Sequence, residues 1–317
     1  MPKGEFESDY KHKAHLQKGF NAILIEDFVQ YVLRTIPDAK TRPLKIIDLC
    51  CGDGGKTRAL LEALEEAGVQ IACIVGVDIS EQQIQVATQD HTDCKKLAFL
   101  CGDVANLSFN NEFDLGLSLF GLHWLPDINV AARSIHQVLK PSGQLMFFVP
   151  LEKQDLFAYR TSLVSSEAWG RYFSQFRLQP FHDSVTPYAQ AFNRFFIPEN
   201  TAGVIALSQR VDFDLVRFKE FLSSWIQELR HLPLEVRGIY LDQLINCLPG
   251  CFKLEEDFDK NLNVDLYRDK QQTGDSPHLM VRFFERAGWG HYKKSVLEKE
   301  GVDVAAAAAL STKNMGS

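Results

Sequence analysis

Glycines and carboxylates that could hold a nucleoside stand at three places in the first half of the chain. The run Asp48–Gly55 follows an apolar stretch, Asp78 follows a second one, and Asp103 follows a third. Glycines let the backbone approach a ligand closely, and the free N–H groups of a following helix favour an anionic group such as a carboxylate. Asp78 is placed to accept hydrogen bonds from two ribose hydroxyls. Asp103 is placed to take an exocyclic amine, with Val104 flanking an adenine ring.

These residues can act together only if the elements before them bring them to one edge. From residue 44 to 150, short β-branched runs alternate with amphipathic helical stretches, which predicts a parallel sheet covered by helices. The expected strands are residues 45–50, 71–77, 97–100, 113–120 and 144–149. In this architecture ligands bind outside the carboxyl ends of the strands, so the three places are expected to meet there.

Helix signals separate the expected strands. Ser80 with Gln83 three residues later predicts a capping box, and Asp127 predicts the cap of a later helix that Lys140–Gly143 ends. Outside this block, residues 20–36 and 234–248 have helical periodicity, and residues 151–200 are rich in aromatic side chains without strand alternation. Residues 204–213 and 278–284 are expected to be late strands.

Composition and charge exclude several classes of function. The chain has 317 residues with 34 Lys and Arg against 41 Asp and Glu, a net charge of −7. Binding to nucleic acid is not expected, because it needs clustered Lys and Arg side chains. No apolar run approaches the roughly 18 residues that a membrane span needs. The acidic, polar N-terminus and seven cysteines, an odd number, favour a cytoplasmic protein with reduced thiols. No metal site is expected, because Cys247 and Cys251 have no second Cys or His pair nearby.

Over at least residues 44–150 the chain resembles the class I S-adenosyl-L-methionine-dependent methyltransferases. Their first motif, Asp-x-Gly-x-Gly-x-Gly, is matched by Asp48, Gly52 and Gly54, with Cys50 in place of the first glycine. A small side chain is expected to fit there unless residue 50 needs a positive φ. The resemblance implies an α/β, Rossmann-like, doubly wound, mostly parallel seven-stranded sheet with a reversed last strand and a helical lid.

The resemblance also implies a role for each residue of the expected cofactor site. The cofactor would be S-adenosyl-L-methionine and the product S-adenosyl-L-homocysteine, with no metal. The residues that the resemblance assigns to the methionine end, the ribose and the adenine are, in chain order, Asp48, Cys50, Gly52, Gly54, Asp78, Ile79, Asp103, Val104 and Leu119.

Two other interpretations of the same residues remain open. A nicotinamide dinucleotide fold would need glycines at positions 50, 52 and 55, so it lacks its first glycine at Cys50 and leaves Asp48 and Asp103 unexplained. An aspartate that ends a strand is also a common helix cap or turn former, independent of any ligand.

The expected acceptor is a small molecule. After the fourth strand the sequence Ser118–Trp124 lacks the Asn/Asp-Pro-Pro-aromatic pattern that holds amide or nucleobase nitrogens, so amide N-methylation is disfavoured. A carboxylate is already ionised at neutral pH and needs no general base. We therefore expect transfer to a carboxylate oxygen of an organic acid, by positioning alone and with no catalytic side chain.

The stretch Leu122–Asp127, together with Tyr10 and Gln17, resembles the carboxyl methyltransferases of the trans-aconitate and juvenile hormone acid types. This resemblance implies that Gln17, His123 and Trp124 line the acceptor pocket. Trp124 as a packed corner of the sheet and His123 as a turn histidine are the alternatives. A protein-directed methyltransferase and an inactive regulatory protein that binds the cofactor or its product are the alternative functions. The sequence does not indicate the oligomeric state.

We expect five segments along the chain. An N-terminal helical lid segment covers residues 1–43, and the cofactor-binding core covers residues 44–150. A helical cover over the acceptor pocket (151–202) follows, then a region that completes the core (203–292) and a flexible tail (293–317).

Overall fold

The computed structural model describes residues 15–151, 154–176, 178, 182–214, 219, 222–223, 226–247, 264–268 and 278–294. These residues divide into two compact units. The core unit holds the described residues of 21–150, 184–205 and 287–294. The second unit holds those of 15–20, 151–183 and 206–286.

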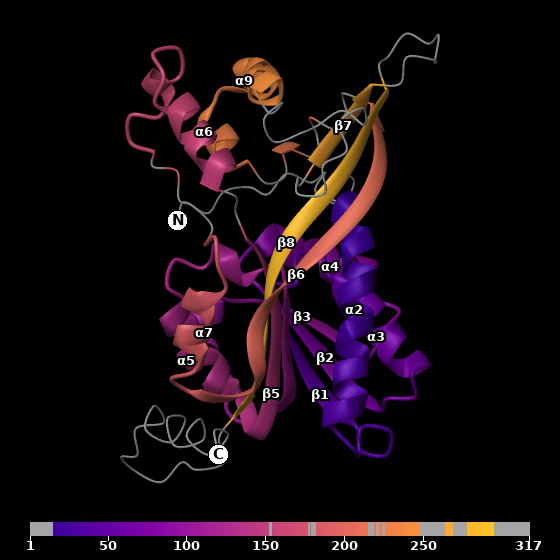
Figure 1. Cartoon of the computed structure of the whole chain (residues 1–317). Helices are drawn as coiled ribbons and strands as arrows, with labels where there is room; N and C mark the ends of the chain where they lie inside the picture. The colour runs from indigo at the N-terminus through magenta and orange to yellow at the C-terminus, as the bar shows by residue number, and fades with distance from the viewer. Residues whose placement is uncertain are drawn as a thin grey trace, which may run out of the picture. The chain divides into compact units, whose positions relative to one another are not determined.

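The core unit is built on a mostly parallel sheet (Figure 1). Within the described residues the sheet to which these strands belong has eight strands in the order β3-β2-β1-β4-β5-β8-β6, with β7, a strand of the second unit, paired to β8 beside this path. The first five strands are parallel and β8 runs antiparallel to β5, which confirms the doubly wound fold and its reversed last strand. The strands are β1 (Leu44–Leu49), β2 (Ile71–Asp78), β3 (Leu97–Cys101), β4 (Phe113–Leu119), β5 (Leu139–Pro150), β6 (Phe196–Asp214), β7 (Val264–Arg268) and β8 (His278–Lys294).

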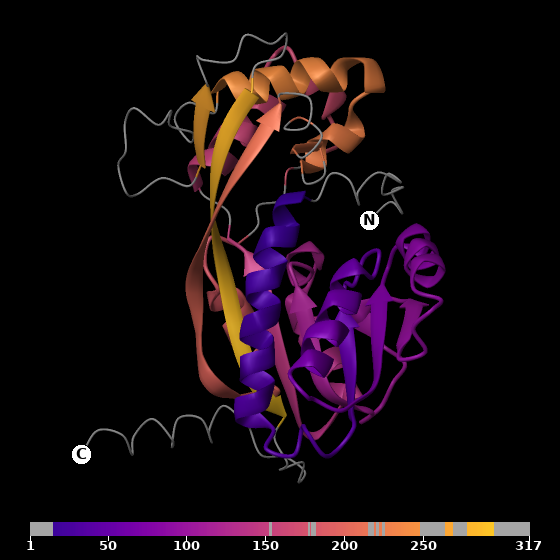
Figure 2. The same cartoon turned by 90° about the vertical axis from the view of Figure 1, so that its right-hand side faces the viewer.

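Helices cover both faces of this sheet, as Figures 1 and 2 show. Helices α2 (His15–Thr35), α3 (Gly55–Glu66) and α4 (Glu81–Asp90) lie on one face, and α5 (Ile128–Val138) and α7 (Thr186–Phe192) on the other. Each helix lays an apolar stripe on the sheet; in α3 the stripe is Leu60, Leu61 and Leu64, all at most 2% exposed. Thr35 of α2 donates to the Gln144 side chain at 2.8 Å, fixing this helix beside β5.

Most expected boundaries agree with the structure, and β5 differs most. It begins at Leu139 rather than residue 144, because Leu139 already pairs with Phe113 before an irregularity in the register. Lys140–Gly143 therefore belong to the strand, with Ser142 at φ 63°, instead of ending the helix. The late strands β6 and β8 are also longer than the expected 204–213 and 278–284.

The two units divide the chain differently from the five expected segments. The described residues of 151–202 contribute to both units, and those of 206–286 belong to the second unit rather than to the core. The reason is that β6 and β8 are long strands, each with residues in both units. Among the described residues of 151–200, helix is found only in α6 (Gln154–Val164), η3 (Gly170–Tyr172) and α7, and β6 starts within this range.

The second unit has its own core. Aromatic and aliphatic side chains of α6, η3, η4 (Gln227–His231) and α9 (Leu234–Cys247) pack together around Trp169, Phe173 and Tyr240. Inside it, Arg160 donates two hydrogen bonds to the Glu228 carboxylate, at 3.0 and 2.8 Å, and the Tyr240 hydroxyl donates a third at 3.0 Å. This buried pair is satisfied by geometry, as a buried charge requires.

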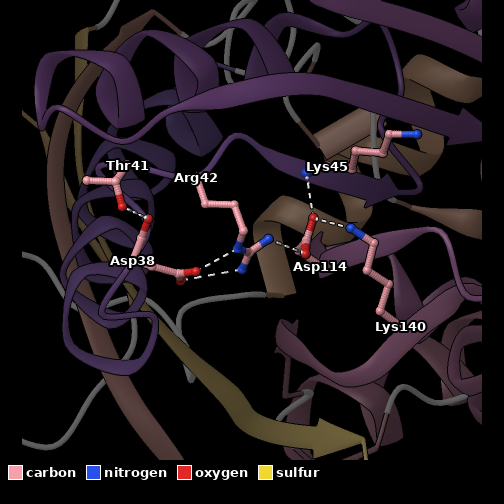
Figure 3. Close-up of polar contacts among 6 residues, drawn as sticks. All are labelled: Asp38, Thr41, Arg42, Lys45, Asp114 and Lys140. Atoms are coloured by element: carbon pink, nitrogen blue, oxygen red, sulfur yellow. Dashed lines mark hydrogen bonds and ion pairs between the residues drawn. The ribbon is translucent and has the colours of Figure 1, made fainter.

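Asp114 stabilises the core sheet at the edge where the parallel strands begin (Figure 3). Its carboxylate, 8% exposed, accepts from the Arg42 side chain at 2.7 Å, the Lys45 backbone N–H at 2.9 Å and the Lys140 ammonium at 2.9 Å. Burial raises the pKa of Asp114, but these hydrogen bonds outweigh it and hold the pKa below its ordinary value. Arg42 also binds Asp38, which ties the end of α2 to the start of the sheet.

No helix within the described ranges is long and apolar enough to cross a membrane.

Candidate functional site

The glycine-rich run connects β1 to α3 at the carboxyl edge of the sheet. Gly52 and Gly54 have φ values of 59° and 75°. A Cβ on Gly54 would lie 2.7 Å from the Phe99 ring, so only glycine fits there. Gly52, in contrast, has open space on its Cβ side, where the nearest atom is Gln83 Oε1 at 4.0 Å. The run thus leaves room beside Gly52.

Cys50 adopts the left-handed conformation, which is the condition under which its departure from the motif was expected to matter. Its φ is 61°, a value that costs a residue with a side chain more than it costs glycine. A Cβ on Gly121 would lie 2.3 Å from the Cys50 Cβ, so the cysteine is accommodated because residue 121 is glycine. Phe120 beside it has φ 58°. Two strained residues therefore stand at adjacent strand ends, a feature typical of functional sites.

Asp78 ties the ends of β1 and β2 together. Its Oδ2 accepts from the Gly52 backbone N–H and its Oδ1 from the Ser80 backbone N–H, both at 2.9 Å. Each carboxylate oxygen can accept a second hydrogen bond, so Asp78 keeps capacity for two donors. The next residue, Ile79, is 63% exposed, an apolar side chain without cover at the ligand edge.

Gln83 lies on the buried side of α4 and makes only half of the expected capping box. Its backbone N–H donates to Ser80 Oγ at 3.3 Å. The reciprocal position, the Ser80 N–H, is taken by Asp78. The side chain of Gln83 is 7% exposed and its Oε1 has no hydrogen-bond partner. Sequence reasoning missed this residue because the capping pattern explained it.

Asp103 and Val104 follow β3 and begin the short helix η1 (Val104–Asn106). Asp103 is exposed and caps this helix by accepting from the Ala105 N–H at 2.8 Å. Val104 is 3% exposed, packed into the core. The capping interpretation of Asp103 therefore holds structurally, and its role toward an amine stays a prediction.

Asp48 is buried beneath the glycine-rich run and supports it. Only 4% exposed, its Oδ2 accepts from the Thr57 hydroxyl at 2.6 Å. Burial raises the pKa of Asp48 to about 6, against the opposing effects of the Thr57 hydrogen bond and the Lys56 charge. Asp48 thus holds the first turn of α3 to the end of β1.

Lys56 is a site residue that the sequence analysis did not single out. Its ammonium donates to the carbonyl oxygen of Leu119, the last residue of β4, at 2.7 Å. Its positive charge has a lowering effect on the pKa values of Asp48, Cys50 and His123. A cation in the first turn of a helix opposes the helix dipole. That unfavourable placement is the sequence signal that could have identified it.

His123 and Trp124 lie in η2 (Leu122–Trp124), directly after β4. Both are partly buried, and their ring centroids are 4.8 Å apart. Burial, helped by the nearby charge of Lys56, lowers the pKa of His123 to about 3, so the imidazole is neutral at neutral pH. Gln17 falls within α2, but its side chain lies outside the described residues, as does Tyr10.

The structure therefore brings together the ends of β1, β2 and β4 through Asp48, Gly52, Lys56, Asp78 and Leu119. Within the described ranges, no three His, Cys, Asp or Glu side chains are grouped as metal ligands would be.

A family model described as "Methyltransferase domain" matches residues 47–147, which run from within β1 to within β5 and include the residues of these hydrogen bonds. The match supports S-adenosyl-L-methionine as the cofactor and the enzyme class that the sequence predicted. The matched residues include His123 and Trp124 but not Gln17 or the expected cover (151–202), and the description names no acceptor, so the carboxylate acceptor is left untested.

Curated relatives match part of the chain. A demethylmenaquinone methyltransferase from Staphylococcus epidermidis is 36% identical over 103 residues, which are 32% of this chain and 41% of the relative. One from Staphylococcus aureus is 32% identical over 128 residues, 40% of this chain and 52% of the relative. The chain thus spans about half or less of the length of these relatives.

Among solved structures, the YcgJ protein from Bacillus subtilis superposes with a TM-score of 0.50 at 15% identity, covering 86% of this chain and 97% of that one. At that identity the likeness concerns the fold, and it agrees with the mostly parallel sheet of the core unit.

Proposed function

We propose that the chain is an S-adenosyl-L-methionine-dependent methyltransferase that acts on a small-molecule acceptor. One observation carries the proposal: within the residues that match the methyltransferase model, the Gly52 N–H donates to the Asp78 carboxylate, and the space on the Cβ side of Gly52 is open. This contact joins the ends of β1 and β2, where a ligand of this architecture binds.

The residues present fit such a cofactor. Asp78 has capacity for two hydroxyl donors, and Ile79 offers an exposed apolar surface for a purine ring. The Lys56 ammonium can bind the carboxylate of the methionine part, since only one of its three N–H groups is used by Leu119. The unpartnered Gln83 Oε1 is a further sign that a polar ligand belongs here.

Bound S-adenosyl-L-methionine supplies a methyl group on a positively charged sulfur, which an acceptor takes by in-line displacement. The chain contributes orientation, because alignment of two reactants alone lowers such a barrier by several kcal/mol. The partly buried His123, whose pKa is lowered to about 3, is a poor proton acceptor at neutral pH. That favours an acceptor already ionised in solution, and we propose a carboxylate oxygen of an organic acid.

The acceptor roles of Gln17, His123 and Trp124, and a cover formed by residues 1–43 and 151–202, belong to this proposal. The relatives' name offers a second acceptor class, a demethylated quinone. It concerns proteins that match this chain over only 103 and 128 residues, so we treat it as an outcome of the test.

Transfer of a labelled methyl group distinguishes these acceptors. The purified full chain is incubated with S-adenosyl-L-methionine labelled with tritium in its methyl group and with a cell extract, and products are separated by mass. We expect label in the small-molecule fraction that mild alkali releases as volatile methanol, as a methyl ester does. Alkali-stable label in a lipid extract would replace the carboxylate by a quinone. Label in protein, or none above an Asp78→Ala control, would contradict the proposal.

A further inference from the structure

Gln83 is a polar residue at a position where the helix pattern calls for an apolar one. In α4 the buried residues are Gln83, Ile84 and Ala87, so the amide shares the face that packs on the core. Its side chain is 7% exposed and Oε1 has no partner. A buried acceptor without a donor costs free energy, and such departures from local rules are expected at functional sites.

The local hydrogen bonds explain why this side chain is available. A glutamine at this position of a capping box normally reaches back to the N–H of the capping serine. Here the Ser80 N–H donates to Asp78 Oδ1 instead, at 2.9 Å. Asp78 therefore occupies the place of the Gln83 amide in the box, and the amide turns inward.

The surroundings of the amide define what donor it lacks. Oε1 lies 4.0 Å from where a Cβ of Gly52 would stand, on the open side of the glycine-rich run. Gly52 itself donates to Asp78 Oδ2 at 2.9 Å. Two acceptors, the Asp78 carboxylate and the Gln83 carbonyl, thus flank the same glycine. A vicinal diol supplies two O–H donors from adjacent carbons, one for each of these acceptors.

We propose that the side-chain carbonyl of Gln83 accepts a hydrogen bond from a ribose hydroxyl of the bound nucleoside, so that Gln83 and Asp78 share the diol. This inference rests on the proposed function and adds a residue to it. It also changes the expected role of Asp78: with one backbone N–H on each oxygen, the carboxylate organises the loop and holds only part of the ribose.

The test compares two ligands on matched variants of the full chain. Gln83→Met keeps the length of the side chain and removes the acceptor; Gln85→Met makes the same change at an exposed position of the same helix. Calorimetry measures the Kd of S-adenosyl-L-homocysteine and of its 2′,3′-dideoxy analogue. We expect Gln83→Met to weaken the first about tenfold and the second less than twofold, with Gln85→Met unchanged for both.

Stability provides the second readout. Because Gln83→Met removes an unsatisfied buried acceptor, the ligand-free variant should unfold at the same or a higher urea concentration than the wild type. Equal loss of affinity for both ligands, or no loss for either, would overturn the inference. If wild-type protein bound neither ligand, the proposed function itself would fail, so the two failures are distinguishable.

Discussion

The two edges of the core sheet treat their carboxylates differently. At the amino edge, Asp114 accepts three hydrogen bonds, two of them from cationic side chains, and its pKa is lowered. At the carboxyl edge, Asp48 accepts one hydroxyl and its pKa is raised to about 6. Asp78 there keeps unused acceptor capacity, and Gln83 Oε1 has no donor at all.

The contrast separates a stabilising role from a binding role. A carboxylate that is fully paired strengthens the fold and offers nothing to a ligand. Buried polar groups with too few partners lower stability unless a ligand supplies the missing hydrogen bonds. The positive φ values of Cys50 and Phe120 also lower stability. The hydrogen bonds at the amino edge stabilise the sheet, and the polar groups at the carboxyl edge are arranged to bind a ligand.

The largest expected effect is a pH dependence of opposite sign at the two edges. The pKa of Asp48 is raised in the folded state, so its stabilising contribution is complete below about pH 4 and is lost as pH rises through 6. Asp48→Asn removes this loss. Urea unfolding of the ligand-free protein should show the variant gaining roughly 2–3 kcal/mol on the wild type between pH 4 and pH 7.

Asp114 gives the control for that experiment. Its pKa is lowered, so its contribution is present above its ordinary pKa and is lost as pH falls. Asp114→Asn should therefore narrow its stability gap to the wild type on acidification. A gap between Asp48→Asn and the wild type that does not change with pH would remove the electrostatic part of the comparison.

The second effect is the loss of stability when the amino edge is broken. Asp114→Ala leaves three donors without their acceptor, and we expect a loss of about 2 kcal/mol in the free energy of unfolding at pH 7. Arg42 and Lys140 are 44% and 38% exposed and regain water, which limits the cost. Affinity for S-adenosyl-L-homocysteine should stay within twofold. A tenfold loss of affinity would show that the two edges are not separate in role.

The smallest effect concerns Lys56. If its ammonium binds the methionine carboxylate, Lys56→Met should weaken S-adenosyl-L-homocysteine about fivefold. It should leave unchanged the Kd of 5′-methylthioadenosine, which lacks that carboxylate. Calorimetry with both ligands measures the difference. Equal weakening of both would assign Lys56 to the support of Leu119 instead of to the ligand.

Much of the core fold could be predicted because its signals are local. The strand β2 and the caps Ser80 and Asp127 lie where periodicity and capping rules put them. The start of β5 could not, since Leu139 joins the strand by pairing with Phe113, a contact distant in sequence. The lengths of β6 and β8 likewise depend on pairing across the sheet.

For the site, the sequence predicted which loops meet but not how their hydrogen bonds are shared. Asp48, Gly52 and Asp78 could be identified from their residue types and their positions after apolar stretches. The sequence could not show that Asp78 displaces Gln83 from its capping box, because that competition depends on three-dimensional positions. The sequence also could not show that Cys50 takes a positive φ, which is possible because Gly121 has no Cβ.

The central claim is that the carboxyl edge binds S-adenosyl-L-methionine and its product, and calorimetry with S-adenosyl-L-homocysteine tests it most directly. We predict saturable heat with the wild-type chain, unchanged affinity in Asp114→Ala, and at least tenfold weaker binding in Asp78→Ala, because the loss of its hydrogen bonds exceeds about 1.4 kcal/mol. No heat with the wild type, or equal affinity in Asp78→Ala, would contradict the account.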